Sequence, residues 1–522
     1  MQRRYILFLI LICLCVKCDG VRRQRDTYDK NVKVLVLGAG VAGMNAAKTL
    51  YEAGYTNIQV LEAKDRIGGR IKNVNIGDHS VELGAVWIYG KGSNPVFQLA
   101  EKHRLSTVVD EDSWVVRDSN GKNVTAEADE LYYQLEDAIE GLMTYVPSSK
   151  DDFNVAGGLK YFNWTEKSNV AEAVETFTFE YELSVPPFAH SGKHLNLYNA
   201  NEDFESYELL VTNHSSGFVH VIERMSENFT NSEEDSVLFN TVVNEIEYGD
   251  EYVKVKTVDG RTFEADFAIV TFSLGVLQQR MVNFNPVLPD RKQFAINTFG
   301  FGSCTYIYVQ FSRQFWDDTS YIVYASTMRE MNYIIMNMNV VKPGSNILFF
   351  SLSDTAGEWA EKEDESNVIA ELLTSLQKMY PNAIIPEPTD YVMSRWNTDP
   401  FTYGVWSYWP PGFSVNDMEK LKAPVGRLYF AGEYTHELHF GFVHGAYLSG
   451  ERVAQQVIGC IEDSVYCNKL ADWDTSDGDD DNDNKYDGGV KCTSNATLRL
   501  FSSFSNLAIT LFVVIFASII LF

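Results

Sequence analysis

A glycine-rich turn near the N-terminus is the feature that most constrains the fold of this chain. The apolar run 34–37 leads directly into Gly38-Ala39-Gly40-Val41-Ala42-Gly43, and a helical pattern over 44–52 follows. A second apolar run, 58–61, ends at the acidic residue Glu62. This order predicts a strand, a turn, a helix and a second strand, with a G-x-G-x-x-G motif in the turn. Such a unit is typical of a Rossmann-like, dinucleotide-binding α/β domain.

Each residue type in the motif has a physical reason. Gly38 makes the tight turn, Gly40 lets the backbone approach a pyrophosphate, and Gly43 lets the helix pack against the strand. The helix N-terminus offers free N–H groups and the positive end of its dipole to the phosphates. Glu62 is placed to accept hydrogen bonds from a ribose. The motif alone fits NAD and FAD equally well.

The residues that follow the second predicted strand favour FAD. The segment Glu62-Ala63-Lys64-Asp65-Arg66-Ile67-Gly68-Gly69-Arg70 resembles the E-A-x-x-R-x-G-G-R segment of the flavin-containing amine oxidases. In that family the second arginine and the glycines approach the FAD pyrophosphate. The resemblance implies that Arg66, Gly69 and Arg70 contact the cofactor.

A segment near the end of the predicted folded part carries the same resemblance. Residues 423–435 predict a strand that ends at a Gly-Glu corner, and a glycine-rich helix start follows at 442–450. That helix start repeats the anion-binding arrangement of the first motif. Together the two segments resemble the polyamine oxidases, most closely the secreted plant-type enzymes, over residues 32–467. Further cofactor contacts implied by the resemblance are Gly84, Ala85, Val86, Trp87, Val243, Trp396, Gly432, Glu433 and Val443.

The resemblance implies a two-domain α/β flavoprotein. A Rossmann-like FAD-binding domain is assembled from three separate pieces, and a substrate-binding domain with a mixed sheet and helices is built from two insertions. Along the chain, the residue patterns predict a hairpin of strands 242–248 and 252–258 and a helix over 365–379. The expected boundaries are 30–94, 236–298 and 395–467 for the FAD-binding domain, and 95–235 and 299–394 for the substrate-binding domain.

The chemistry implied by the family is oxidation of a polyamine (spermine, spermidine or an acetylated form) by O2. FAD takes a hydride equivalent from the carbon next to an amine nitrogen, and the resulting imine hydrolyses. The expected products are an aminoaldehyde, a shorter amine and H2O2. The reacting amine must be neutral, which an aromatic pocket of low dielectric favours. Trp406 and Phe442 match the family's pair of aromatic residues that face the flavin.

Three positions depart from the family's pattern. Gly404 stands where monoamine oxidases attach flavin through a cysteine, so we expect non-covalent FAD. Tyr306 stands where the family has a lysine that holds a water near the flavin, and a phenol does not supply that charge. Tyr89 replaces the tunnel glutamate of plant-type enzymes, which leaves Glu182 as the acidic candidate for the distal ammonium. We assign Trp87 and Tyr306, with the aromatic pair, to the catalytic centre.

Tyr306 leaves two other functions open. One is a flavin oxidase for a different amine. The other is a surface protein that keeps FAD but has little or no turnover. An NAD-dependent dehydrogenase is disfavoured, because it leaves the C-terminal flavin-like segment unexplained.

The acidic balance of the chain excludes one class of partner. The 522 residues carry a formal charge of −28, which argues against nucleic acid and favours cationic small molecules or plain solubility. A hydrophobic content of 45% excludes general disorder. We expect no metal site, because the acidic stretch 472–487 fits no EF-hand register.

Both ends of the chain indicate the secretory pathway. Residues 1–20 form a predicted signal peptide, with Arg3 and Arg4 before an apolar run. An acidic linker over 468–495 precedes an apolar tail, 496–522, with the layout of a glycosylphosphatidylinositol (GPI) attachment signal. A retained membrane anchor is the alternative. We therefore expect the protein on the extracellular face of the cell membrane or secreted.

The cysteines and glycosylation patterns agree with that route. Cys460 and Cys467 are close enough in sequence to form a disulfide in an oxidising compartment, whereas Cys304 lies in an apolar run and is expected to be a buried thiol. The N-x-S/T pattern marks candidate N-glycosylation sites. It occurs at Asn123, Asn163, Asn213, Asn228 and Asn495.

Overall fold

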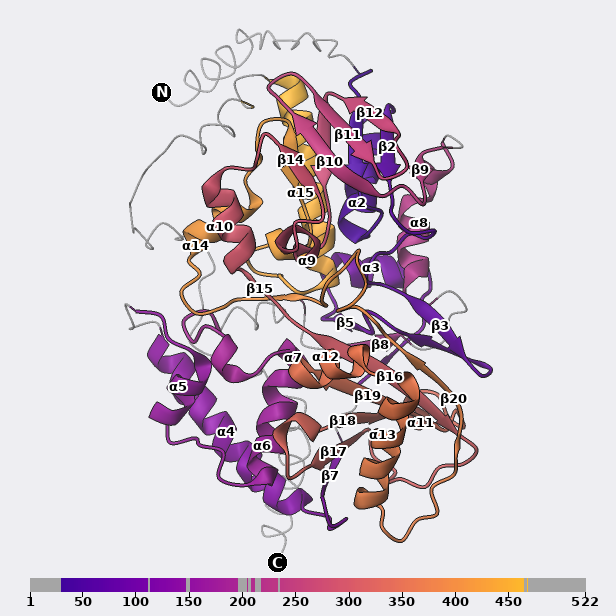
Figure 1. Ribbon diagram of the computed structural model, residues 1–522, viewed down its shortest axis with the longest axis vertical. Coiled ribbons are helices and arrows are strands. Elements are labelled where there is room, and N and C mark those ends of the chain that lie inside the picture. Colours follow the sequence, from indigo (N-terminus) through magenta and orange to yellow (C-terminus); the bar gives the residue numbers. More distant parts are fainter. Residues whose placement is uncertain are drawn as a thin grey trace, which may run out of the picture.

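The computed structural model describes residues 30–110, 113–146, 151–195, 204, 208–211, 217–232, 235–463 and 467. They form a mixed α/β fold with two large sheets, which lie in the upper and lower halves of the view in Figure 1. The signal peptide, the linker and tail after residue 467, Asn213 and Asn495 lie outside the described residues. Within them, no helix combines the length and apolar character needed to cross a membrane.

The upper half is built on a five-stranded sheet with the strand order β22-β13-β1-β2-β9. Neighbouring strands pair in parallel throughout. The central strand β1 is buried along its whole length, as expected for a parallel sheet covered on both faces. The strands are β1 (Val34–Leu37), β2 (Ile58–Leu61), β9 (Val237–Leu238), β13 (Phe267–Val270) and β22 (Leu428–Phe430).

Helices α2 (Val41–Glu52) and α15 (Val443–Glu462) pack against each other beside this sheet (Figure 1). Gly450 permits the close approach, because a Cβ there would lie 2.2 Å from the Ala42 carbonyl oxygen. Helix α2 begins three residues before the predicted 44–52, since Gly43 is part of the helix and faces β1. Helices α3 (Pro95–Lys102) and α8 (Val219–Thr230) also pack in this layer, although their sequence positions fall in the range expected for the substrate-binding domain.

A smaller, four-stranded sheet lies beside the first one, with the order β12-β11-β10-β14. Strands β10 and β11 pair antiparallel, so the predicted hairpin is confirmed. The bounds are β10 (Val243–Tyr248), β11 (Val253–Thr257), β12 (Thr262–Ala265) and β14 (Asn283–Asn285), and nearby helices are α9 (Leu274–Gln278), α10 (Asp290–Thr298) and α14 (Val415–Lys422).

The lower half is built on a six-stranded sheet with the order β20-β16-β19-β18-β17-β7. Helix α13 (Glu365–Met379) covers one face and confirms the predicted helix over 365–379. The strands are β7 (Trp114–Asp118), β16 (Cys304–Phe311), β17 (Tyr321–Ala325), β18 (Ile334–Asn337), β19 (Ile347–Ser353) and β20 (Pro388–Met393), with α11 (Met338–Val341) and α12 (Asp354–Lys362) beside them.

A helical segment packs on the β7 and β17 edge of the six-stranded sheet. Its third helix, α6, continues into a short π-helix, η2, and then into α7. π-helical turns are rare and often lie at functional sites. The bounds are α4 (Thr125–Tyr145), α5 (Val155–Tyr161), α6 (Asn169–Glu175), η2 (Thr176–Glu180), α7 (Tyr181–Leu183), and the 3-10 turns η3 (Pro187–Ala189) and η5 (Arg329–Met331).

Short strands join the two halves. In the sheet β5-β8-β6, the Trp87 ring of β5 lies 6.3 Å from the Phe349 ring of β19 in the lower sheet. Strand β3 pairs with β4 in a hairpin. The bounds are β3 (Asn73–Ile76), β4 (His79–Glu82), β5 (Trp87–Tyr89), β6 (Thr107–Val109), β8 (Glu208–Val211), β15 (Gly300–Phe301), β21 (Ser407–Tyr408) and η6 (Glu433–Thr435).

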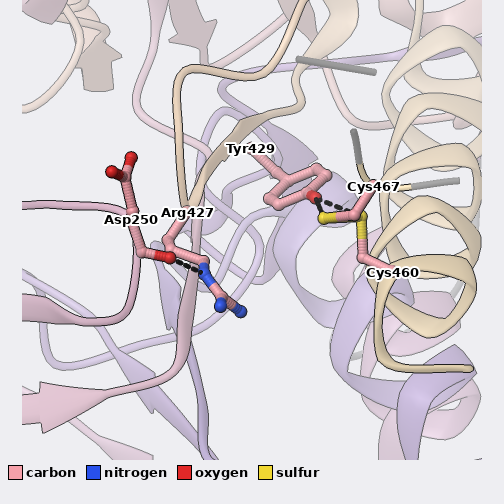
Figure 2. The surroundings of a disulfide bond; sticks show 5 residues. All are labelled: Asp250, Arg427, Tyr429, Cys460 and Cys467. Carbon is pink, nitrogen blue, oxygen red and sulfur yellow. Dashed lines mark hydrogen bonds between the residues drawn. A yellow bond between two sulfur atoms is a disulfide. The ribbon is translucent and has the colours of Figure 1, made fainter. Parts of the chain in front are cut away.

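The predicted disulfide is present at the C-terminal end of α15. Cys460 and Cys467 are bonded, and the Tyr429 hydroxyl lies 2.9 Å from the Cys460 sulfur (Figure 2). On the other side of β22, the Arg427 guanidinium donates to the Asp250 carbonyl oxygen at 2.6 Å, which ties this strand to the β10–β11 turn. Cys304 is a buried free thiol, as predicted.

Candidate active site

A cavity of about 370 Å³ lies where the two halves meet. Its lining begins at the N-terminal turns of α2 and α15 and continues to aromatic side chains from β5, α7 and β16. Nearly all of the predicted site residues line it. They are Gly38, Gly40, Glu62, Gly69, Arg70, Gly84, Ala85, Val86, Trp87, Tyr89, Glu182, Val243, Tyr306, Trp396, Trp406, Gly432, Glu433, Phe442 and Val443.

The glycines at one end form a cradle made of backbone. A Cβ on Gly69 would lie 3.3 Å from the Gly40 Cα, so two bare main chains face each other there. Gly40 precedes α2 and provides no side-chain cap, which leaves the first N–H groups of the helix without a side-chain acceptor. Orphan N–H groups at a helix N-terminus are a ready anion site.

Gly43 does not line the cavity. A Cβ on it would lie only 2.0 Å from the Gly38 carbonyl oxygen, so its role is the close packing of α2 on β1. This is the packing function expected of the third glycine, and it places Gly43 behind the cradle instead of in it.

Glu62 ends β2 with its carboxylate at the cavity. One oxygen accepts the Ala39 N–H at 2.7 Å and the other accepts the Lys64 N–H at 2.8 Å. Burial raises the pKa of Glu62, and these two hydrogen bonds oppose the shift. The remaining acceptor positions of the carboxylate suit the hydroxyls of a ribose.

The two arginines of the glycine-rich segment have different places. Arg66 is not in the cavity lining, because its guanidinium donates to the carbonyl oxygens of Ile67, Gly69 and Ile71 at 2.7–3.1 Å. In this structure Arg66 therefore stabilises the loop, and its contact with the cofactor stays a prediction. Arg70 does line the cavity and pairs with Glu433 at 2.9 Å.

Glu433 organises the loops that carry the aromatic pair. It is buried, and besides Arg70 it accepts hydrogen bonds from Ser407 and from the Gly441 N–H. Ser407 follows Trp406 and Gly441 precedes Phe442, so one carboxylate fixes both loops. Gly404 lies nearby with φ +134°, and a side chain there would collide with Phe301. The chain thus offers no side chain at this position for a covalent bond to flavin.

Trp396 closes the middle of the cavity. Its indole N–H donates to the Leu83 carbonyl oxygen at 2.8 Å, and the Lys64 ammonium lies 5.4 Å from the ring centroid. Gly84 follows Leu83, and a Cβ on it would lie 1.9 Å from the Arg70 carbonyl oxygen. The segment 84–87 can therefore pass close to the arginine loop only with glycine at this position.

Aromatic side chains form the opposite end of the cavity. The ring of Tyr89 lies 5.0 Å from that of Phe442, and Trp87 meets Tyr181 edge-on at 6.0 Å. Trp406 and Tyr306 complete this wall. Burial raises the pKa of the Tyr306 phenol well above its ordinary value, so this group stays neutral. The structure brings all four predicted catalytic residues to one end of the cavity.

Glu182 supplies a negative charge at this aromatic end. It lies in α7, directly after the π-helix, and its carboxylate contributes to the raised pKa of Tyr89, Tyr181 and Tyr306. The two predicted substrate residues, Tyr89 and Glu182, are therefore neighbours. Among the described lining residues, the basic side chains are Lys64 and Arg70, both toward the glycine-rich end.

Some lining residues were not found from the sequence. Tyr181 stands next to Glu182 in a segment that has no distinctive motif. His444 lies in the first turn of α15, its ring stacks on Phe442 at 5.2 Å, and burial keeps its pKa well below the ordinary value. The sequence Val443-His444-Gly445-Ala446 could have indicated His444, because it belongs to the segment that carries the resemblance.

These residues fit a flavin dinucleotide. The backbone cradle and the two uncapped helix N-termini suit a pyrophosphate, and the Glu62 carboxylate suits a ribose. The aromatic end provides flat apolar faces for a ring system. The fit rests on the geometry of backbone and side chains together.

Comparison with known proteins gives consistent findings. The family model described as "Flavin containing amine oxidoreductase" matches residues 41–458. A polyamine oxidase of Oryza sativa subsp. japonica is 32% identical over 457 residues, which cover 82% of this chain and 91% of the relative. A polyamine oxidase of Zea mays is 32% identical over 456 residues, with the same coverage. A solved structure of a putrescine oxidase double mutant superposes with a TM-score of 0.67 at 20% identity, covering 82% of this chain and 99% of the other.

Proposed function

This chain belongs to the family of flavin-containing amine oxidoreductases, and on that premise we propose that it oxidises polyamines such as spermine, spermidine or their acetylated forms with O2. It is an FAD-dependent amine oxidase. FAD, when bound, supplies the two-electron chemistry by taking a hydride equivalent from the carbon next to an amine nitrogen. The observation that carries the choice of substrate is the carboxylate of Glu182 set in an aromatic wall.

The cofactor is held mainly by the glycine-rich end. The first turn of α2 and the cradle of Gly40 and Gly69 would hold the pyrophosphate, and the Glu62 carboxylate would accept a hydrogen bond from a ribose hydroxyl. Arg70 lies beside this region, paired with Glu433. The segment 84–87 and the turn that carries Phe442 would hold the ring system.

The aromatic end orients the substrate and selects its charge. Glu182 attracts a distal ammonium, while Trp406 and Phe442 surround the reacting nitrogen. Their apolar rings disfavour a charge at that nitrogen, so the amine reacts in its neutral form. Loss of the hydride equivalent gives an imine, and addition of water gives an aminoaldehyde and a shorter amine.

Tyr306 determines how fast O2 is used. Its neutral phenol can hold a water through a hydrogen bond but adds no positive charge near the forming peroxide. We therefore propose a slow reaction with O2. Because of Tyr306, two alternative functions also remain. They are an oxidase for another amine and a protein with very low turnover.

The test uses the full-length protein with bound FAD. Spermine, spermidine and acetylspermine are added without oxygen while the visible flavin band is followed. Bleaching by one of them, and recovery with stoichiometric H2O2 when air is admitted, is the expected result. A band that stays oxidised with every polyamine, but bleaches with a simple monoamine, moves the assignment to another amine. A band that no amine bleaches overturns the proposal.

We also propose that the protein works outside the cell, held by a GPI anchor or secreted. The side chains of Asn123, Asn163 and Asn228 are exposed, as glycosylation requires. The disulfide at the end of α15 is suited to an oxidising compartment. Expression of the full chain in a eukaryotic cell tests this. A mass shift on N-glycosidase treatment and release by phosphatidylinositol-specific phospholipase are expected, and an intracellular, unmodified protein contradicts it.

A further inference from the structure

A buried carboxylate stands behind the aromatic wall of the cavity. Asp110 follows β6, is 8% exposed, and does not line the cavity. The Trp87 indole N–H donates to its Oδ2 at 2.9 Å, and the Tyr321 hydroxyl donates to the same oxygen at 2.6 Å. One carboxylate therefore accepts hydrogen bonds from two aromatic residues that belong to different sheets.

Both donors lead into the cavity wall. Trp87 lines the cavity itself, and the Tyr181 hydroxyl donates to the Tyr321 hydroxyl at 3.4 Å. Tyr181 also lines the cavity and meets Trp87 edge-on. The hydrogen bonds of Asp110 therefore set two neighbouring wall residues at once, one directly and one through Tyr321.

The charge of Asp110 also reaches the wall. It contributes to the raised pKa of Tyr181 and of Tyr321, after burial, and both of its aromatic donors are neutral groups. Glu182 acts on the pKa of Tyr181 in the same direction. Two carboxylates therefore act on the aromatic end, and of these Glu182 lines the cavity and Asp110 does not.

We propose that Asp110 is a positioning and specificity-determining residue of the amine site. Its hydrogen bonds fix Trp87 and Tyr181, and its charge adds to that of Glu182 so that the cavity prefers substrates with a second ammonium. This inference rests on the proposed amine oxidation. It assigns a role to a residue that touches neither cofactor nor substrate.

The size of the charge effect follows from Coulomb's law. A unit charge acting over about 10 Å at an effective dielectric near 20 changes an affinity roughly tenfold. A substitution that keeps the shape and the acceptor oxygen but removes the charge separates this effect from the hydrogen bonds. Asp110→Asn is that substitution.

The experiment compares two ligands of equal length, diaminooctane and octylamine, on the full-length protein with FAD. Binding is followed anaerobically through the perturbation of the visible flavin band, and steady-state kinetics are recorded for spermidine and acetylspermidine. For Asp110→Asn we expect about tenfold weaker binding of diaminooctane and less than a twofold change for octylamine. The KM of spermidine should rise more than that of acetylspermidine, with kcat changing less than KM.

The chain offers a matched control. The Trp114 indole N–H donates to Asp129 at 2.9 Å, which repeats the pairing of Trp87 with Asp110 outside the cavity lining. Asp129→Asn should leave the ratio of diamine to monoamine affinity unchanged. Tyr321→Phe is the second variant, because it removes both hydrogen bonds of the Tyr321 hydroxyl, to Asp110 and from Tyr181, and keeps the charge. It should lower kcat for all amines alike without changing that ratio.

The outcomes are distinct. Equal weakening of diamine and monoamine in Asp110→Asn means a purely structural residue and overturns the proposal. A changed ratio in Tyr321→Phe or in Asp129→Asn also overturns it. If Asp110→Asn does not fold, Tyr321→Phe tests the positioning role by itself, and an unchanged kcat for every amine then overturns the proposal. If the wild type oxidises no amine, the proposed function fails, while the two binding constants still decide the role of Asp110.

Discussion

The two ends of the cavity are built on opposite principles. The glycine-rich end is made of backbone: bare glycines, helix N-termini and one carboxylate, all within the segment 38–70 apart from α15. The aromatic end is made of side chains from β5, α7, β16 and two loops that lie far apart in the sequence. The glycine-rich end tolerates few substitutions, because its main-chain atoms already lie in contact with one another. The aromatic end contains Tyr89 and Tyr306, two of the positions at which the sequence is expected to depart from the family's pattern.

This difference indicates where each function can vary. Backbone contacts recognise what all dinucleotides share, whereas side chains select one substrate from many. Substitutions at the first end should therefore affect cofactor binding and stability together. Substitutions at the second should change rates and preferences while FAD stays bound.

The largest effect on stability is expected at Gly43, which tests directly whether the glycine-rich end tolerates a side chain. A Cβ there would lie 2.0 Å from the carbonyl oxygen of Gly38, which directly follows β1, so α2 must move in Gly43→Ala. We expect a loss of about 3 kcal/mol or more in the free energy of unfolding, with release of FAD. Gly249→Ala is the control, because its Cβ would meet Tyr252 at an ordinary 3.6 Å. Thermal unfolding of both variants checks this, and a fully stable, yellow Gly43→Ala protein contradicts it.

The next largest effect is expected at Glu82, which ends β4 and lies outside the cavity lining. Glu82 is buried, accepts the Phe218 N–H at 2.8 Å, and its pKa is raised to about 7, chiefly by burial. Because the raised pKa favours the protonated carboxyl in the folded state, this stability is fully present below the unfolded pKa of about 4.5 and is lost as pH rises through about 7.

The loss amounts to at most about 3 kcal/mol. Unfolding by urea at about pH 5 and about pH 8 measures it, and Glu82→Gln should remove this part of the pH dependence. The expected sign is wrong if, relative to Glu82→Gln, the wild-type protein becomes more stable between about pH 5 and about pH 8.

Glu62→Gln sharpens the comparison from the glycine-rich side. The amide keeps one acceptor oxygen and turns its NH2 group toward the Ala39 or Lys64 N–H. Leaving one buried donor without its acceptor costs about 2 kcal/mol in the free energy of unfolding. The neutral amide is also a weaker acceptor for a ribose hydroxyl than the carboxylate, so we expect roughly tenfold weaker FAD binding. Equilibrium dialysis measures it. At saturating FAD, kcat should stay close to that of the wild type, and a large fall in kcat would show that the two ends are not independent.

Tyr306→Lys tests the aromatic side and should have the smallest energetic effect. A cation at this position stabilises the negative charge that develops as O2 is reduced. We expect about tenfold faster flavin reoxidation in stopped-flow experiments, or about 1.4 kcal/mol in the barrier. Tyr306→Phe is the control for loss of the phenol alone. If reoxidation by O2 does not accelerate in Tyr306→Lys, the account of this position is wrong.

The same contrast explains what could be predicted from the sequence. The strand, turn and helix of the first motif are contiguous, so spacing alone places Gly38, Gly40 and Glu62 in one site. The sequence does not reveal the loop contacts of Arg66, because a side chain can bind a cofactor or its own loop and the spacing is identical in both cases. Asp110 gave no signal, since it begins an acidic run that has the composition of a solvated loop. Its role depends on Tyr321, which is distant in the sequence and adjacent only in the folded sheet.

The parallel sheet of the cofactor-binding half can be completed only late in translation. Strand β1 is made at the start, but β22, which flanks β13, follows about 400 residues later. At roughly 5–20 residues per second, a ribosome needs about 20–80 s to cover that interval. During this time β1 and α2 lack their partner α15 and expose apolar surface. A nascent chain of this kind depends on chaperones in the meantime, and it can take up its cofactor only when it is nearly complete.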